Sequence, residues 1–266
     1  HYDVIIDMRS TLKSMFFTLF SPSTEYRIGL KKWYTGFAFN YFFEKTNRNK
    51  CMVDHDLMLL SPLNYKVLDQ NFHIPITENE KEEFKDYMVK MKIDFSKPVV
   101  LMGVTSKLKN KTWSEEGMVY VVRNLIKTFP QVQVIFNYAL GKEEQASRRI
   151  YELLDNDPHI FIDVRAQSPR QLAAMASWIT LYFGNEGGAR HIIHSQDKPS
   201  FVVVAPQNSK KMWLPQNGIP TGGVGIEDFV SPSQLAKIPT DRQYDLIKKE
   251  KVWIEFLKFI NKYHIL

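Results

Sequence analysis

The chain has 266 residues and a formal net charge of +6 at pH 7; 44% of its residues are hydrophobic and 24% are charged. This composition excludes a disordered or fibrous protein, and the length accommodates two α/β domains or one large one. The lysines and arginines are dispersed and form no nucleic-acid-binding signature, so the charge favours a small anionic partner or merely a soluble basic surface over nucleic acid.

The first ninety residues are irregular. Residues 2–8 predict a buried strand, and residues 10–20 predict the helix that follows it, with its apolar positions on one side. The aromatic stretch 33–43 is typical either of core packing, which we favour, or of a lipid-facing patch. Thr77 and Glu80 form the sequence signature of a capping box and predict a helix start.

From Lys97 onward, apolar β-rich runs alternate with helical patterns. Residues 114–129 have apolar positions at helical spacing, and Ser168-Pro169 is typical of a helix start. This βαβ alternation predicts a Rossmann-like domain with a parallel sheet. Its five strands are expected at 98–104, 132–138, 159–164, 178–184 and 200–206.

The polar stretch before Pro98 is the best candidate for a domain boundary. The sequence therefore predicts an N-terminal domain over residues 1–96 and a Rossmann-like domain over 97–240. Residues 241–266 predict a long C-terminal helix whose apolar positions are spaced to pack on other elements.

Glycines follow the predicted strand 178–184. Gly187 and Gly188 allow the backbone to approach a ligand closely at a helix start, where free N–H groups favour phosphate. Tight turns of this kind also use glycine for geometry alone. The position favours a ligand, because ligands of open α/β sheets bind outside the carboxyl ends of the strands.

The turn after the strand 98–104 carries hydroxyl and ammonium groups just before a helix start: Thr105, Ser106, Lys107, Lys109 and Lys111. Such groups suit a diphosphate. The alternative is a solvated basic loop.

The strand 132–138 is followed by Glu143 and Glu144. A carboxylate here either accepts hydrogen bonds from ribose hydroxyls or a base amine, or stabilises a helix start. Three strand ends of one sheet thus predict phosphate, hydroxyl and carboxylate chemistry at one rim.

Three other groups of residues invite a functional interpretation. Asp155-Asn156-Asp157 resembles a metal-binding DxD string, but it precedes a strand, so we predict a surface turn. His191 and His194 are spaced to share a metal, but a third ligand is missing nearby, so we predict packing. Asp7 ends the first strand, where structural pairing is favoured over a role as base.

The order TSKLKNKTW, GKEE and FGNEGGARHIIHSQDKPSFVVVAP resembles glycosyltransferase family nine, the lipopolysaccharide heptosyltransferases. YDVIIDMRSTLKS resembles the family's first-domain strand and LLKS helix, and YRIGL (26–30) resembles its RIG turn. The resemblance implies an α/β protein of the GT-B fold, with two Rossmann-like domains whose parallel sheets face a cleft, the N-terminal one incomplete here. It implies that the C-terminal helix packs back across the domains.

The resemblance also implies site residues. Thr105, Ser106 and Lys111 would hold the donor diphosphate, and Glu143 or its neighbour Glu144 would contact the nucleoside. Lys13 would face the interdomain cleft and neutralise the acceptor or the leaving diphosphate. The family has a turn under the sugar and phosphates in which an acidic residue, a small residue and a glycine are followed by a histidine. The corresponding residues here are Glu186, Gly187, Gly188 and His191.

Two departures from the family pattern matter. The family usually has Asp followed by Ser or Thr where this chain has Glu186 and Gly187, so a donor hydroxyl contact is lost. The aspartate expected to act as general base would precede His1 and is not in the chain.

The resemblance implies an inverting transfer of a heptose-like sugar from ADP-heptose or a similar donor to a lipopolysaccharide-core, glycolipid or other saccharide acceptor, with no metal and no cofactor. The alternatives are a nucleotide-sugar epimerase and a non-catalytic nucleotide-sugar-binding protein. A dehydrogenase is disfavoured because no G-x-G-x-x-G follows a predicted strand.

A single cysteine, Cys51, excludes an intrachain disulfide and favours a reducing compartment. No apolar run approaches the roughly 18 to 20 residues of a membrane span, and no leader opens the sequence. We therefore expect a cytoplasmic protein, with peripheral association at the cytoplasmic face of the inner membrane left open.

Overall fold

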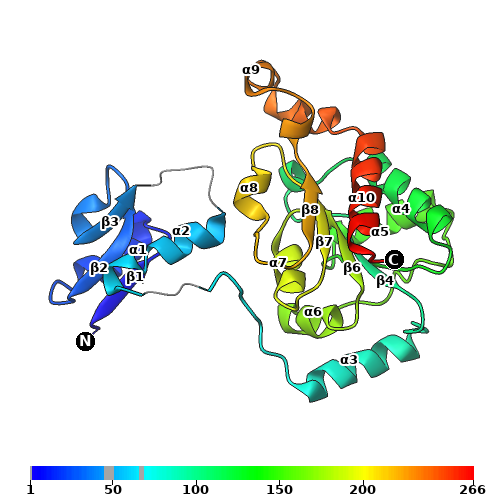
Figure 1. The fold of residues 1–266 in the computed structure, drawn as a ribbon, viewed down its shortest axis with the longest axis horizontal. Helices are drawn as coiled ribbons and strands as arrows, with labels where there is room; N and C mark the ends of the chain where they lie inside the picture. Colours follow the sequence, from blue (N-terminus) through cyan, green and yellow to red (C-terminus); the bar gives the residue numbers. More distant parts are fainter. Residues whose placement is uncertain (1, 45–50, 66–68) are drawn as a thin grey trace. The chain divides into compact units, whose positions relative to one another are not determined.

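The computed structural model describes residues 2–44, 51–65 and 69–266 (Figure 1). The chain divides into two compact units. Unit 1 consists of residues 1–70 and 211–215, and unit 2 consists of residues 71–210 and 216–266. Each unit contains a parallel sheet with helices, so the predicted α/β class is confirmed.

Unit 1 is built on a three-stranded parallel sheet in the order β1-β2-β3. The predicted strand and helix at 2–20 are confirmed, whereas YRIGL forms a strand and not a turn. Its Ile28 is fully buried, and Gly29 lies under the Phe39 ring. The elements are β1 (Val4–Asp7), α1 (Leu12–Leu19), β2 (Tyr26–Lys31), β3 (Tyr41–Glu44) and α2 (Met52–Met58).

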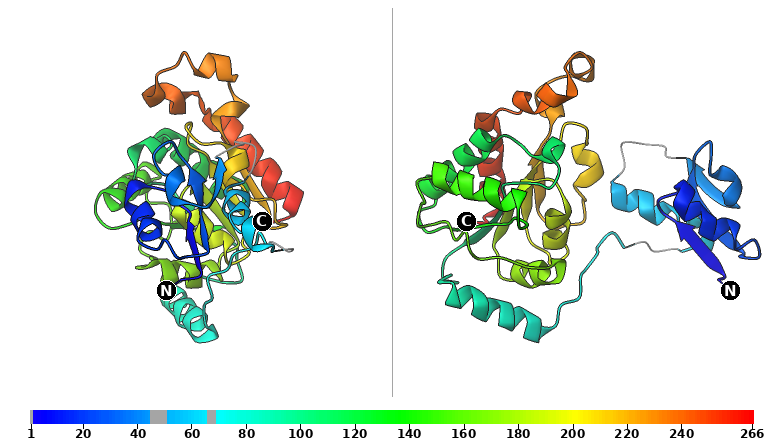
Figure 2. Two further views of the ribbon diagram at one scale, coloured as in Figure 1. Left: turned by 90° about the vertical axis from the view of Figure 1, so that its left-hand side faces the viewer. Right: turned by 180° about the vertical axis from the view of Figure 1, so that it is seen from behind.

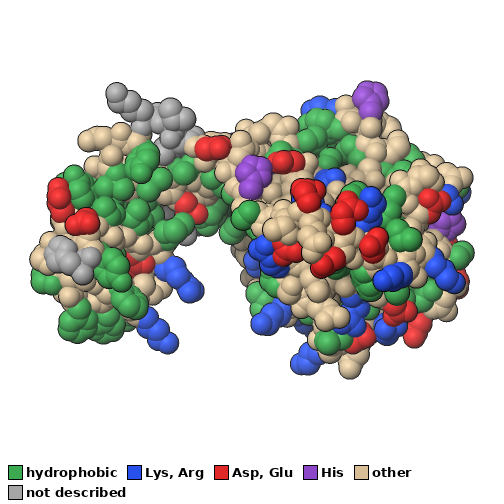
Figure 3. All heavy atoms as spheres, turned by 90° about the horizontal axis from the view of Figure 1, so that it is seen from below, with side chains coloured by type: hydrophobic (Ala, Val, Ile, Leu, Met, Phe, Trp, Pro, Cys, Tyr) green, Lys and Arg blue, Asp and Glu red, His purple; other side chains and the backbone are tan. Residues whose placement is uncertain are grey.

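Hydrophobic side chains cover much of the visible face of unit 1 (Figure 3). The predicted apolar side of α1 buries Met15 but leaves Phe16 51% exposed. The preference for core packing of the stretch 33–43 is wrong for Trp33 and Phe37, which are 95% and 70% exposed. In the described part of the chain, this stretch packs mainly through Ala38 and Phe39.

Unit 2 contains a five-stranded parallel sheet in the order β5-β4-β6-β7-β8. The chain passes outward from β4 to β5 and then returns past β4 to β6, so the strand order reverses beside β4. Ligands of open α/β sheets bind at such a switch point. The strands are β4 (Val99–Gly103), β5 (Gln133–Phe136), β6 (Leu181–Asn185), β7 (Ser200–Val203) and β8 (Thr221–Val224).

Helices cover both faces of this sheet (Figures 1 and 2). One face carries α4 (Glu115–Thr128), α5 (Lys142–Leu153) and α10 (Lys249–Tyr263). The other carries α6 (Pro169–Ala176) and α7 (Gly188–His194), with α3 (Glu78–Lys90) packed on α6. The short helices α8 (Lys210–Trp213) and α9 (Pro232–Leu235) lie in the connections.

The predicted helix starts are confirmed in unit 2. Thr77 and Glu80 form a reciprocal capping box at α3. The side chains of Ser114 and Ser168 accept backbone N–H bonds at the starts of α4 and α6. These caps satisfy donors that a helix end would otherwise leave open, so the local sequence fixes where these helices begin.

Two strand assignments differ from the sequence prediction. Residues 159–164 make only one bridge, between Ile160 and Val134, because the chain turns away when Val164 N–H donates to the Phe161 carbonyl. The fifth strand is instead β8, whose Gly222 and Gly223 carry no apolar side chains that would reveal it.

The observed boundary between the units lies before α3, whereas the sequence placed it after residue 96. The physical reason is that α3 packs on α6, with Trp178 Nε1 donating to the Lys81 carbonyl at 2.8 Å. The predicted C-terminal helix is a 3₁₀ turn (Thr240–Leu246) followed by α10, and α10 packs on α4, β7 and β8.

Among the described residues, no helix combines the length and apolarity needed to span a membrane.

Gly184 allows β4 and β6 to approach closely. A Cβ at this position would lie 2.6 Å from the Gly103 carbonyl oxygen, which belongs to the backbone of the neighbouring strand. We expect Gly184→Ala to lower the free energy of unfolding by about 1–3 kcal/mol, measured by urea denaturation. Gly188→Ala is the matched control, because its Cβ would meet nothing within 4 Å; equal losses in both variants would contradict the packing argument.

Candidate functional site

A cavity of about 950 Å³ opens at the carboxyl ends of β4, β5 and β6. The three strand-end loops predicted to share a rim meet here, so that prediction is confirmed. Of the residues singled out in the sequence as candidates for ligand binding, seven line the cavity: Thr105, Ser106, Lys107, Glu143, Glu186, Gly187 and Gly188. A fourth segment, residues 165–169, which the sequence analysis did not assign to the site, completes the wall.

Asn185, at the end of β6, forms hydrogen bonds to both ends of the loop between β4 and α4. Its side chain is 3% exposed; Nδ2 donates to the Gly103 carbonyl at 3.1 Å, and Oδ1 accepts the Trp113 N–H at 2.7 Å. The Trp113 indole in turn donates to the Ile247 carbonyl at 3.1 Å. The loop between β4 and α4 is therefore held against the end of β6, which fixes one side of the cavity.

Glu186 is nearly fully buried, at 3% exposure. Its Oε2 lies 3.7 Å from Lys111 Nζ and accepts a hydrogen bond from Asn208 Nδ2 at 2.8 Å. Lys111 is not a lining residue of the cavity itself and is connected to it through this ion pair. The pair offsets the negative charge of the carboxylate at the rim, where an anionic ligand would otherwise be repelled.

Gly187 and Gly188 leave open space at the cavity wall. A Cβ at either position would meet no atom within 4 Å, and the φ of Gly187 is 170°, an extended conformation open to any residue. Neither backbone geometry nor packing within the described chain demands glycine here. The bare backbone instead leaves room for another molecule at this wall.

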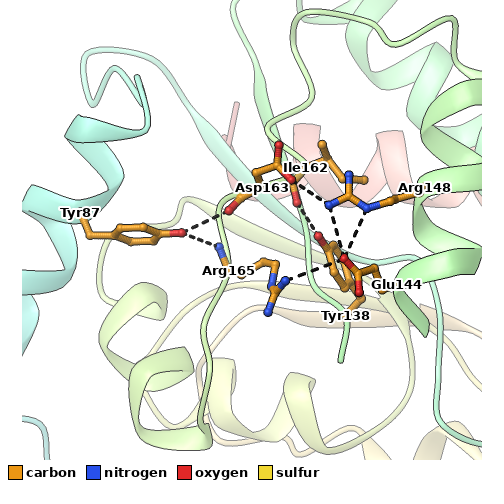
Figure 4. A network of polar contacts seen from close by, with 7 residues as sticks. All are labelled: Tyr87, Tyr138, Glu144, Arg148, Ile162, Asp163 and Arg165. Carbon is orange, nitrogen blue, oxygen red and sulfur yellow. Dashed lines mark hydrogen bonds and ion pairs between the residues drawn. The ribbon is translucent and has the colours of Figure 1, made fainter. Parts of the chain in front are cut away.

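The two glutamates after β5 have different surroundings. Glu143 lines the cavity, and its Oε2 accepts the Ala139 N–H at 3.4 Å. Glu144 is paired with Arg148 at 3.4 Å and with Arg165 at 3.9 Å (Figure 4). Between these two, the cavity-facing carboxylate is that of Glu143.

His191 and His194 lie in α7 beside the buried Arg190. Arg190 Nη2 donates to His191 Nδ1 at 3.1 Å, and the His194 ring lies 5.4 Å from that of Phe72. His191 is not a lining residue of the cavity. Burial, together with the charge of Arg190, lowers the pKa of His191 to about 3 and that of His194 to about 4. Both imidazoles are therefore neutral at pH 7.

These lowered pKa values predict a loss of stability in acid. Below pH 6.5 an unfolded histidine binds a proton, whereas folded His194 does so only near pH 4. The stabilisation is complete above pH 6.5 and is lost as the pH falls toward 4. We expect urea midpoints to fall between pH 7 and pH 4.5, and His194→Gln to flatten that dependence. If the urea midpoint of His194→Gln depended on pH as steeply as that of the unaltered chain, the lowered pKa of His194 would not be the cause of the acid sensitivity.

Lys13 lies in unit 1, as the second residue of α1. With Arg9, Thr11, Ser14 and neighbouring residues it lines a separate cavity of about 650 Å³. This cavity is thus lined by the two cationic side chains of Arg9 and Lys13 and by the hydroxyl groups of Thr11, Ser14 and Tyr34.

The prediction that Asp7 pairs structurally is confirmed. Its Oδ1 accepts the N–H groups of Arg9 at 3.1 Å and Ser10 at 2.8 Å. This contact holds Ser10 in a left-handed conformation, with φ of 46°, at the turn between β1 and α1. Ser10 Oγ also accepts the Leu30 N–H at 2.7 Å, which ties the turn to β2.

The string Asp155-Asn156-Asp157 forms a turn, as predicted. Asp155 and Asn156 both have positive φ, and Asp157 Oδ1 contacts His159 Nδ1 at 2.7 Å. Within the residues that the structure describes, no group of three or more His, Cys, Asp or Glu side chains is placed to hold a metal ion.

Comparisons with known proteins agree with this geometry. Residues 1–216 match the model of glycosyltransferase family 9 (heptosyltransferase). A curated relative, lipopolysaccharide heptosyltransferase 1 of Campylobacter coli, is 21% identical over 211 residues, which are 76% of this chain. The chain spans 61% of the length of that relative.

Solved structures show the same fold. A glycosyltransferase family 9 protein from Veillonella parvula superposes with a TM-score of 0.78 at 14% identity, covering 98% of this chain and 74% of its own. The Escherichia coli heptosyltransferase WaaC with ADP superposes with a TM-score of 0.63 at 12% identity, covering 97% and 73%.

Proposed function

Because the chain belongs to glycosyltransferase family 9, the heptosyltransferase family, we propose that it transfers a heptose-like sugar from a nucleoside-diphosphate donor to a lipopolysaccharide-core or other glycan acceptor. The observation that carries this proposal is the cavity where the loops after β4, β5 and β6 meet. Its position beside the reversal of strand order is where nucleotides bind in open α/β sheets.

In this proposal the donor diphosphate lies between two loops of the cavity. Thr105 and Ser106 supply hydroxyl donors on one side, and the open backbone at Gly187 and Gly188 lies on the other. The ammonium group of Lys111, which lies 3.7 Å from Glu186 Oε2 at the rim, provides the cation beside the two loops. Glu143 would accept hydrogen bonds from the ribose hydroxyls of the nucleoside.

The proposed reaction is a displacement at the anomeric carbon with inversion. An acceptor hydroxyl oxygen forms the new bond to that carbon as the bond to the diphosphate oxygen breaks, and a general base takes the hydroxyl proton. Cationic groups stabilise the charge that develops on the diphosphate. In this scheme Lys13 neutralises the acceptor or the leaving diphosphate.

A binding and turnover experiment tests the proposal. ADP and other nucleoside diphosphates are titrated by calorimetry, and nucleotide sugars are then incubated with and without saccharide or glycolipid acceptors. We expect saturable nucleotide binding and sugar transfer only when an acceptor is present. Release of free epimerised nucleotide sugar without acceptor would indicate an epimerase, and the absence of nucleotide binding would contradict the proposal.

Location can be tested with the same protein. We propose that the reaction occurs in the cytoplasm, with the acceptor presented at the cytoplasmic face of the inner membrane. Sedimentation with vesicles that contain the acceptor glycolipid, compared with vesicles without it, would show whether association depends on the acceptor.

A further inference from the structure

Arg165 lies in the wall segment 165–169, which the sequence analysis did not assign to the site. It lines the cavity, and 25% of its side-chain surface is exposed. The guanidinium carbon lies 5.5 Å from the centroid of the Tyr138 ring, and Nη1 lies 3.9 Å from Glu144 Oε1 (Figure 4). An arginine on an aromatic ring and beside a carboxylate is restrained in orientation as well as in position.

The backbone around Arg165 is fixed by two tyrosines from different elements. The Arg165 N–H donates to Tyr87 Oη at 3.1 Å, and that hydroxyl donates to the Asp163 carbonyl at 3.2 Å. Tyr138 Oη donates to the Ile162 carbonyl at 2.8 Å. Figure 4 shows Tyr87 approaching from α3 and Tyr138 from the end of β5. The segment is therefore held in place by side chains of the chain itself.

The sheet order places Arg165 at one end of the cavity. Ile160 bridges β5 on the side opposite to β4, so the segment 160–165 lies beyond the outermost loop of the cavity. Arg165, Tyr138 and Glu143 gather at this end, whereas Gly187 and Gly188 follow β6 on the other side of β4. A nucleotide with its diphosphate between β4 and β6 would have its nucleoside at the β5 end.

We infer that Arg165 contacts the nucleobase of the donor through the flat face of its guanidinium group. This inference rests on the proposed function and specifies how the nucleoside is held. Guanidinium planes are surfaces on which nucleobases stack, and such stacking is tolerant of base identity because every base presents a π face. Selection among bases would then come from the other groups at this end.

The test separates the nucleoside from the diphosphate. Affinities for ADP and for inorganic pyrophosphate are measured by calorimetry for the unaltered chain and for Arg165→Ala. We expect a loss of about 5- to 100-fold for ADP and no change for pyrophosphate. Arg165→Lys keeps the charge but lacks the planar group, so we expect it to lose ADP affinity to the same extent.

Arg148→Ala is the matched control, because Arg148 also pairs with Glu144, and in addition with Asp163, but does not line the cavity. It should bind ADP as the unaltered chain does. An equal loss for both ligands in Arg165→Ala, or full ADP affinity in Arg165→Lys, would overturn the stacking role alone. Failure of the unaltered chain to bind any nucleotide would overturn the proposed function together with this inference.

Discussion

Replacing Gly187 by aspartate is expected to weaken ADP binding by at least about 100-fold while the fold is retained. The new carboxylate would enter the open space at the cavity wall, where we place the donor phosphates. Two unit charges about 4 Å apart repel by about 4 kcal/mol at an effective dielectric constant of 20. A 100-fold loss corresponds to about 2.8 kcal/mol, so the repulsion suffices.

The fold should tolerate this change because Gly187 is the N-cap of α7, a position that aspartate favours. Gly187→Asn is the matched control, since asparagine caps a helix equally well and adds no charge. We expect Gly187→Asn to retain most of the ADP affinity, as measured by calorimetry, with both variants melting close to the unaltered protein. Full ADP affinity in Gly187→Asp would place the phosphates elsewhere.

Lys111→Ala is expected to weaken ADP binding by about 10- to 100-fold. Hydrogen bonds to charged groups contribute about 1.5–3 kcal/mol, and the variant loses the ammonium group proposed for the diphosphate. It also removes the cation that lies 3.7 Å from Glu186. The buried carboxylate then keeps its bond from Asn208, but its charge is no longer offset beside the incoming phosphates.

Lys109 provides the control for Lys111. Both residues lie in one 3₁₀ turn (Lys109–Lys111), but Lys109 is exposed and does not line the cavity. Lys109→Ala removes the same net charge from the same loop and should leave ADP affinity unchanged at 150 mM salt, where interactions between exposed charges more than about 8 Å apart are largely screened. Equal losses of ADP affinity in the two variants would show that Lys111 acts only through the net positive charge of the loop and not through a direct contact with the diphosphate.

The sequence predicted those elements whose signals are local. The strands β4 to β7 are buried runs rich in apolar residues. The capping side chains of Thr77, Ser114 and Ser168 mark helix starts without reference to the rest of the chain. The loops that line the cavity were predictable for a related reason, because parallel strands end at a common edge.

The errors arose where pairing or packing decided the outcome. Residues 159–164 are as apolar as a strand, but the Phe161 carbonyl accepts a bond within a turn and the pairing ends after one bridge. The glycine-containing β8 forms because β7 offers it an edge. The exposure of Trp33 likewise depends on which elements of unit 1 cover its surface.

At the site, the sequence alone determined which residue types stand at the strand ends, because hydroxyls, glycines and carboxylates there depend only on where each strand stops. The tertiary structure decided which of them act together. It placed Glu143 at the cavity and Glu144 in ion pairs with arginines. It also buried Glu186 beside Lys111 and Asn208 and positioned the Arg165 guanidinium over the Tyr138 ring. Such contacts join residues distant in the chain, and their energies depend on distances and burial that no local pattern encodes.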